Sequence, residues 1–135
     1  MRNCLKDIQP AMRMKGRALN RAMRSGRKRR AEAKRAAAMS TLNHQGWRVA
    51  THAVGDAAVD QVLDAYAAAD KDQSIKGKRW SIEHFFIARP EQLPRASALD
   101  LVISAQDHLY LAGPSLVTYW GRKRAEMVTP VRSFL

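Results

Sequence analysis

The sequence predicts an α/β fold built on a parallel sheet, and the alternation of two kinds of segment carries this prediction. Three short β-like runs occupy residues 47–52, 79–84 and 101–106, and a helical pattern lies between each run and the next. Strands that alternate with helices in this way form parallel sheets with crossover connections. In such sheets, ligands bind beyond the carboxyl ends of the strands. The first two runs each end in a histidine, so His52 and His84 are candidate site residues.

Basic residues dominate the first 37 positions, which we call the arm. The arm contains 13 lysines and arginines and 2 acidic residues, whereas residues 38–135 contain 11 and 10. Arginine and alanine favour helix, which predicts a helix from Ala31 to Asn43 that stops at Gly46. The rest of the arm has little apolar periodicity, and we expect it to be poorly ordered or partly helical. The sequence thus predicts an arm at residues 1–37 and a domain at residues 38–135.

Three interpretations of the arm stay open. The first is a solvated tail without a role of its own. The second is a weak, salt-sensitive nucleic-acid binder, because arginine-rich segments gain affinity by releasing counterions. The arm has no aromatic residue for base stacking, which counts against this interpretation. The third is an arm that arose from out-of-frame or misassigned coding sequence, because its composition is poor in apolar residues.

Apolar spacing predicts the first helix of the domain. The pattern i, i+3, i+4 and i+7 over residues 57–69 is that of one buried helix face. Gly55 and Asp56 come just before it as turn glycine and N-cap. Asp60 and Asp64 lie off the apolar face and are expected to face solvent. The residues expected to form the packing set are Leu42, Trp47, Val49, Val59, Val62, Leu63 and Tyr66.

Proline and glycine mark the later elements. Pro90 is expected to open a second helix, with Pro94 in its first turn. The apolar run over residues 101–105 predicts a strand that is covered on both faces. Gly113 and Pro114 are expected to interrupt the secondary structure before a short amphipathic segment that ends at Trp120. The pair at residues 129–130, Thr-Pro, predicts the start of a last helix.

Composition excludes several classes of protein. The 135 residues suffice for one domain, and no run of eighteen apolar residues exists, so no membrane span is expected. Cys4 is the single cysteine, which excludes an internal disulfide framework and a cysteine-based zinc site. A reducing, cytoplasmic location fits this cysteine usage.

His52 and His84 are the residues best suited to chemistry. Imidazole is the commonest protein ligand of zinc, and the ends of neighbouring parallel strands can direct two imidazoles at one ion. We therefore expect the two side chains to lie close together at one edge of the sheet. The alternative is a pair of polar strand-end residues bonded to loop carbonyls. Strict alternation places Glu83 on the face opposite His84. Asp56 is most simply an N-cap, with a second role in orienting His52 left open.

The residues from about Met39 onward resemble the amidohydrolase superfamily, in particular the amidohydrolase 3 branch that includes N-substituted formamide deformylase-like proteins. The segments that carry the resemblance are residues 46–58 (GWRVATHAVGDAA), 80–84 (WSIEH) and 103–108 (ISAQDH). Such enzymes are (β/α)8 TIM barrels with one or two divalent metal ions, often zinc. The resemblance implies a partial barrel of about three parallel βα units, similar to strands five to seven.

The same resemblance implies roles for individual residues. His52 and His84 would be the metal ligands after strands five and six. Gln106 and His108 would lie after strand seven, near a small amide-like substrate whose C–N bond is hydrolysed.

Other parts of the family's site have no counterpart here. The histidine pair after the first strand, the bridging ligand of the fourth and the aspartate of the eighth are absent, so no catalytic general base is assigned. We expect a fragment of a metal-dependent amidohydrolase, from a truncated or frame-disrupted gene and inactive alone. The alternative is a small basic nucleic-acid-binding protein that acts through residues 1–37.

Overall fold

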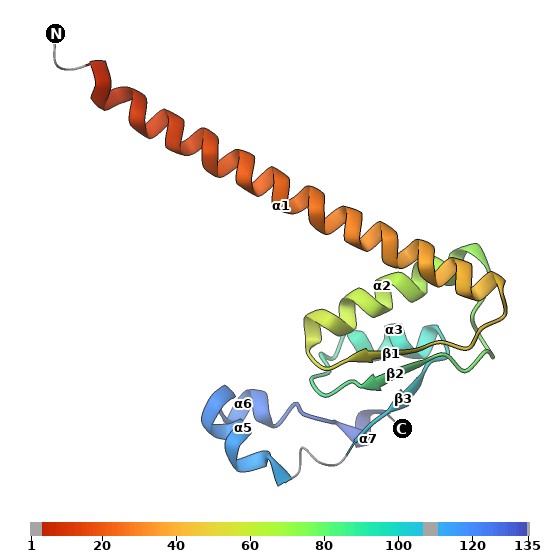
Figure 1. Cartoon of the computed structure of the whole chain (residues 1–135). Coiled ribbons are helices and arrows are strands. Elements are labelled where there is room, and N and C mark those ends of the chain that lie inside the picture. Colours follow the sequence, from red (N-terminus) through yellow and green to blue (C-terminus); the bar gives the residue numbers. More distant parts are fainter. Residues whose placement is uncertain (1–3, 107–110, 135) are drawn as a thin grey trace. The chain divides into compact units, whose positions relative to one another are not determined.

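The computed structural model of the chain describes residues 4–106 and 111–134 (Figure 1). Contacts between residues divide the chain into two units, Met1–Lys34 and Arg35–Leu135. The second unit contains all the strands described below. His108, predicted to lie near the substrate, falls outside the described residues.

The first helix, α1, runs from Cys4 to His44 and is 41 residues long. The predicted helix over residues 31–43 is observed as the last part of α1, which extends further toward the N-terminus than predicted. Arginine, lysine, alanine and methionine fill the segment, and their high helix propensity outweighs the cost of its two glycines. Although α1 is long, no helix in the described part of the chain combines length with the apolar character needed to cross a membrane.

Three strands form one parallel sheet in the order β1-β2-β3, as the sequence predicts. They are β1 (Ala50–Ala53), β2 (Ser81–His84) and β3 (Val102–Ser104). Figure 1 shows the arrowheads of β1 and β2 at the same end of the sheet. Each strand begins later than predicted, and β3 is not covered on both faces, because Val102 is 39% exposed.

Helix α2 (Asp56–Asp72) supplies most of the core. Its predicted apolar face is buried, and it packs with Ala53 and Ile82 of the sheet. The N-cap is Gly55 rather than Asp56, which is the first helical residue and makes no capping hydrogen bond. The prediction that Trp47 packs in the core was wrong, because this residue is 61% exposed. Its backbone is bonded instead: the N–H donates to the carbonyl of Leu42, and the carbonyl accepts from the indole N–H of Trp80.

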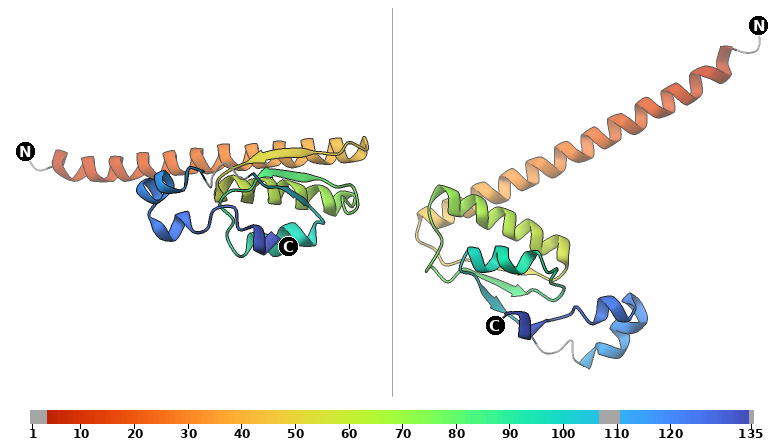
Figure 2. Two further views of the ribbon diagram at one scale, coloured as in Figure 1. Left: turned by 90° about the horizontal axis from the view of Figure 1, so that it is seen from below. Right: turned by 180° about the vertical axis from the view of Figure 1, so that it is seen from behind.

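Four short helices complete the described part of the second unit. Helix α3 (Gln92–Ala98) begins two residues after Pro90, with Pro94 in its first turn as predicted. Gly113 and Pro114 begin α5 (Gly113–Trp120) rather than break the chain, since proline suits the first turn of a helix. Helices α6 (Arg122–Ala125) and α7 (Val131–Phe134) follow. Figures 1 and 2 agree that α5 and α6 lie on the side of the sheet where β1 and β2 end.

A polar network joins α2 to α3. Asp60, predicted to face solvent, is half-buried and accepts hydrogen bonds from Gln92 at 2.9 Å and Arg95 at 3.2 Å, and it pairs with Arg89. These donors, above all the Gln92 amide, hold the pKa of Asp60 below its usual range. The buried Gln92 also donates to the carbonyl of Asp56 at 2.8 Å, so it ties α3 to the first turn of α2.

Asn43 joins the last turn of α1 to the end of α2. Its side chain is 1% exposed, and its amide donates to the carbonyls of Ala69 and Gln73. The Lys78 ammonium donates to the Asn43 side-chain oxygen at 2.6 Å. One buried side chain thus bonds two carbonyls at the end of α2, and the carbonyl of Ala69 also accepts from the backbone N–H of Gln73.

We predict that Asn43→Ala lowers the free energy of unfolding by about 1–3 kcal/mol, because it removes a buried side chain that donates to the Gln73 carbonyl and accepts from the Lys78 ammonium. Urea denaturation followed by circular dichroism measures the loss. The matched control is Thr41→Ala, which removes an exposed hydroxyl bonded within α1 and is expected to change stability by less than about 0.5 kcal/mol. Equal stability of the two variants would contradict the role given to Asn43.

Candidate functional site

His52 and His84 meet at the edge of the sheet where β1 and β2 end. In the register of the two strands, His52 lies opposite Glu83 and His84 lies opposite Ala53. The two imidazole rings are nevertheless in contact, with centroids 4.3 Å apart and planes at 78°. The expected proximity of the two side chains is therefore observed.

The backbone at the end of β2 explains how His84 reaches His52. His84 and Phe85 have φ values of 76° and 49°, a left-handed conformation that non-glycine residues adopt at a cost of order 1–3 kcal/mol. The fully buried Phe85 ring anchors this turn, and the Phe85 N–H donates to the carbonyl of Ala53 at 3.0 Å. The strict alternation of a strand thus ends at His84, and its ring turns toward its neighbour on β1.

The Nδ1 atom of His84 is buried and has no hydrogen-bond partner among the described residues. The ring itself packs against Phe86, with centroids 4.9 Å apart. A buried polar atom without a partner costs free energy and is uncommon in folded proteins. The alternative interpretation, in which a loop carbonyl binds this nitrogen, is not what the structure shows. Instead, an imidazole nitrogen is left able to bind a ligand.

Glu83 is bonded to the serines of the sheet. Its carboxylate accepts a hydrogen bond from the Ser81 hydroxyl at 3.0 Å, and it lies opposite Ser104 in the register of β2 and β3. Hydrogen bonds from Ser104 and then from Ser81 hold the pKa of Glu83 below its usual range. Glu83 therefore shares a polar face of the sheet with Ser81 and Ser104, and the left-handed turn at His84 departs from the alternation that Glu83 follows.

The other predicted residues are only partly brought together. Gln106 is half-buried and follows the end of β3 by two residues, while His108 lies outside the described part of the chain. The Asp56 carboxylate lies 3.8 Å from Arg89 and 3.6 Å from Arg124. Its proposed role in orienting His52 stays a prediction.

The donor set suits a transition metal but does not complete a site. Two imidazoles from neighbouring strands are the donors that zinc prefers, and the unpartnered His84 nitrogen is one of them. Catalytic zinc sites use three protein ligands. Among the residues that the structure describes, no group of three or more histidine, cysteine, aspartate or glutamate side chains could hold one ion. His52 and His84 therefore fit two positions of a larger ligand set.

The comparison with known families matches residues 10–135 to the model described as the amidohydrolase family. The chain belongs to the amidohydrolase family. The match begins within the arm, whereas the motifs that carry the resemblance begin near Gly46.

Two known proteins show how much of the chain is similar to other proteins. The protein LONG AFTER FAR-RED 3 of Arabidopsis thaliana is 36% identical over 81 residues, which are 59% of this chain and 14% of that protein. The crystal structure of an uncharacterized metal-dependent hydrolase from Pyrococcus furiosus is similar with a TM-score of 0.63 and 31% identity, over 76% of this chain and 20% of that one. The chain thus spans a small part of the length of each protein.

We predict that Ser104→Ala raises the pKa of Glu83 toward the ordinary glutamate value of about 4.3, because it removes the largest cause of the lowering. A pH titration of the Glu83 carboxyl carbon by NMR measures the change. Since the folded pKa lies below the unfolded one, ionised Glu83 stabilises the fold above the unfolded pKa. That contribution is lost as the pH falls through the folded pKa.

The control for this titration is Ser74→Ala, which removes a hydroxyl that bonds Asp70 elsewhere in the fold. An unchanged Glu83 pKa in Ser104→Ala would show that the assigned hydrogen bond is absent.

Proposed function

We propose that this chain supplies two histidine ligands, His52 and His84, to the divalent metal centre of an amidohydrolase. The observation that carries the proposal is the contact of the two rings, 4.3 Å apart, with the buried Nδ1 atom of His84 left without a partner. Zinc is the proposed metal because two neutral imidazoles suit it.

The proposed setting is a (β/α)8 barrel. Three parallel strands in sequential order, each followed by helical structure, are what such a barrel repeats. The strands would be the fifth, sixth and seventh of the ring, as the N-substituted formamide deformylase-like branch of the family suggests. Placement of both histidines at the carboxyl ends of strands supports this setting, because active sites of these barrels form there.

The proposed reaction is hydrolysis of a C–N bond in a small amide-like substrate. A divalent ion, when bound, supplies Lewis-acid polarisation of the scissile carbonyl. His52 and His84 would hold the ion, and Gln106 and His108 would contact the substrate. Ionised Glu83 adds negative charge beside His84 and favours a bound cation.

We expect no measurable amide hydrolysis by the 135-residue polypeptide alone. Two histidines leave the ligand set incomplete, and no residue in the described part is placed as the general base of the family's reaction. Loss of a general base costs about 10²–10⁴-fold in rate, and loss of the metal costs more. Zinc-dependent turnover that His84→Ala abolishes would contradict this expectation.

We predict that His52→Ala and His84→Ala each weaken Zn²⁺ binding by about tenfold or more, because each removes one of two nitrogen donors. Isothermal titration with Zn²⁺ near neutral pH measures the affinities. His44→Ala is the matched control, since His44 is an exposed histidine that pairs with Asp72 and lies outside the proposed centre. Binding that is unchanged in both site variants, or weakened equally in the control, would refute the assignment.

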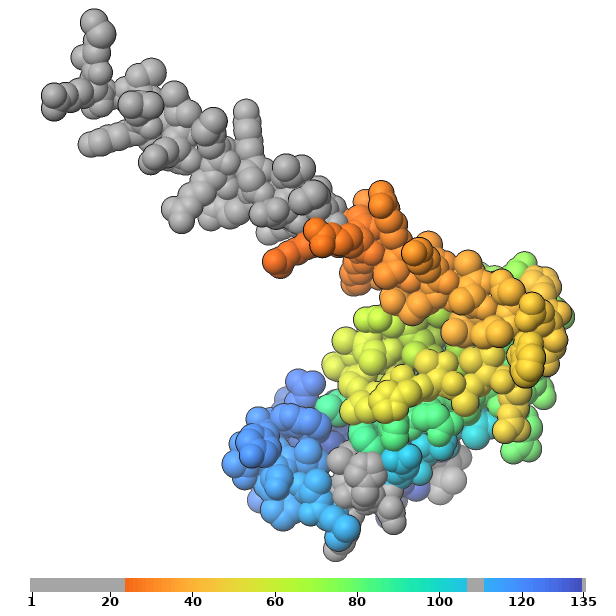
Figure 3. Space-filling view, viewed as in Figure 1, coloured from red at the N-terminus to blue at the C-terminus, as the bar shows by residue number. Residues whose placement is uncertain are grey.

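A second proposal concerns the arm, in which the helical residues from Arg24 to Lys34 carry exposed cations. Figure 3 shows side chains standing out along the coloured part of this helix. Glu32 is the one acidic residue between positions 24 and 34, and it lies 3.8 Å from Lys28. A high density of cations on a helix favours the binding of nucleic acid, because binding releases counterions. The cations are Arg24, Arg27, Lys28, Arg29, Arg30 and Lys34.

We predict weak binding to duplex DNA that declines as salt rises, measured by fluorescence anisotropy of a labelled duplex. The double variant Lys28→Gln/Lys34→Gln should reduce the slope of log K against log salt by about two, since each phosphate contact contributes about 0.9. The matched control, Lys71→Gln/Lys76→Gln, removes two exposed lysines from the second unit. Salt-independent binding, or equal effects of the two double variants, would count against the proposal.

A further inference from the structure

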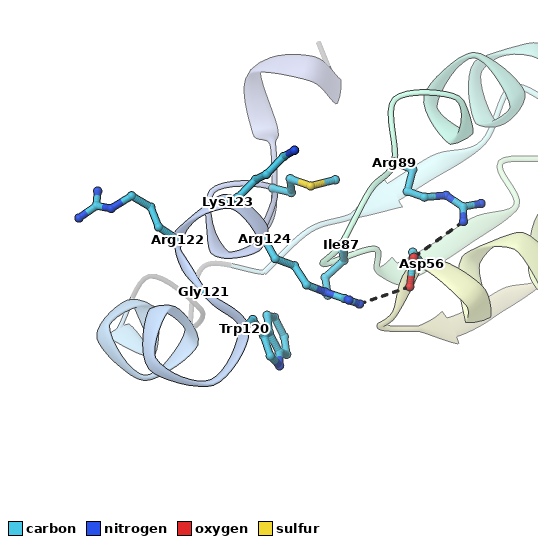
Figure 4. A pocket seen from close by; sticks show the side chains of 9 residues that line it. Asp56, Ile87, Arg89, Trp120, Gly121, Arg122, Lys123 and Arg124 are labelled. Carbon is cyan, nitrogen blue, oxygen red and sulfur yellow. Dashed lines mark ion pairs between the residues drawn. The ribbon is translucent and has the colours of Figure 1, made fainter.

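A pocket of about 530 Å³ lies beside the edge of the sheet where β1 and β2 end. It is bounded by the first residue of α2, the chain after β2 and the segment from α5 to α6 (Figure 4). Neither His52 nor His84 lines it. The lining residues are Asp56, Ile87, Arg89, Trp120, Gly121, Arg122, Lys123, Arg124 and Met127.

One wall of the pocket is apolar. Ile87, Trp120 and Met127 contribute it, and the indole of Trp120 is 39% exposed. An antiparallel bridge between Ile87 and Val128 holds the chain after β2 against the chain after α6. The apolar wall is therefore built from two segments that a backbone bridge holds together, and Trp120 adds an aromatic side chain to it.

Two of the four cations that line the pocket are directed away from it or belong to another network. Arg89 donates to Asp60 and pairs with Glu91 at 2.9 Å, so its guanidinium is part of the polar network that joins α2 to α3. Arg122 pairs with Glu126 at 3.7 Å, and Figure 4 shows its side chain pointing away from Asp56.

Arg124 and Lys123 remain available. The Arg124 guanidinium lies 5.9 Å from the ring centroid of Trp120 and is placed over the indole by this cation–π contact. Arg124 also forms an ion pair with Asp56 at 3.6 Å, and because this distance is longer than a hydrogen bond, its N–H groups can still donate to a second acceptor. Lys123 is exposed and makes no ion pair with any other described residue. Asp56 is the one carboxylate in the lining, and it is shared between Arg89 and Arg124.

We propose that this pocket binds a small organic anion with a planar apolar body, such as an aromatic carboxylate. The planar body would pack against Ile87, Met127 and the part of the Trp120 indole that Arg124 does not cover. Arg124 would bind the carboxylate, and Lys123 would add positive charge at the rim of the pocket. Guanidinium and ammonium groups bind carboxylates through charge-assisted hydrogen bonds, and these are stronger beside an apolar wall than in open water. The volume lies within the range of about 300–1,000 Å³ that is typical of small-molecule sites.

The experiment compares two probes of one shape and different charge. Isothermal titration of the whole chain with 2-naphthoate and with neutral 2-naphthamide measures both affinities without requiring metal or turnover. We expect naphthoate to bind about tenfold more tightly than naphthamide, because only naphthoate accepts charge-assisted hydrogen bonds. Lys123→Gln and Trp120→Ala should each weaken naphthoate binding several-fold, and Trp120→Ala should also weaken naphthamide binding.

The matched control is Lys76→Gln, which neutralises an exposed lysine outside the pocket and should leave naphthoate binding unchanged. Lys123 is also exposed, so its variant is expected to fold as the parent does, and a thermal unfolding curve checks this. Undetectable naphthoate binding, equal binding of the two probes, or equal effects of Lys123→Gln and Lys76→Gln would overturn the proposal.

Discussion

The parallel pairing of β1 with β2 is the constraint on which the rest of the second unit depends. Bonds such as Ser81 N–H to Val49 O and Phe85 N–H to Ala53 O set the register. Parallel neighbours lie about 4.8 Å apart, so side chains at the ends of the two strands meet at one edge. The candidate ligands come from segments about thirty residues apart in the chain, and this pairing brings them into contact.

The core beneath the sheet holds this register in place. Tyr66 of α2 is fully buried, and its hydroxyl donates to the carbonyl of Ser81 at 3.0 Å while lying 2.6 Å from the Thr51 hydroxyl. Burial raises the pKa of Tyr66 to about 12, so the hydroxyl keeps its proton and remains a donor at neutral pH. One side chain therefore links α2 to both β1 and β2. Trp80, which packs on Tyr66 with ring centroids 4.9 Å apart, extends the same core.

Local pattern predicted the parallel sheet, the buried face of α2 and the meeting of His52 with His84. It could not predict the left-handed backbone at His84, because that conformation is imposed by the burial of Phe85 and by pairing with a distant strand. Glu83 follows the alternation of β2, because it bonds Ser81 two residues before it, and His84 is the residue that departs from the alternation. The pocket beside α6 was missed for a similar reason. Its wall depends on a bridge between Ile87 and Val128, which no spacing in the sequence reveals.

His52 and His84 are proposed to bind one metal ion together. The most direct measurement is a Zn²⁺ titration of the chain labelled with ¹⁵N at the histidine rings, with each ring nitrogen followed by NMR. We expect the chemical shifts of the His52 ring nitrogens and of His84 Nδ1 to change along the same binding curve, while those of His44 stay unchanged. Separate binding curves for the two rings, or a response from one ring alone, would contradict a shared ion.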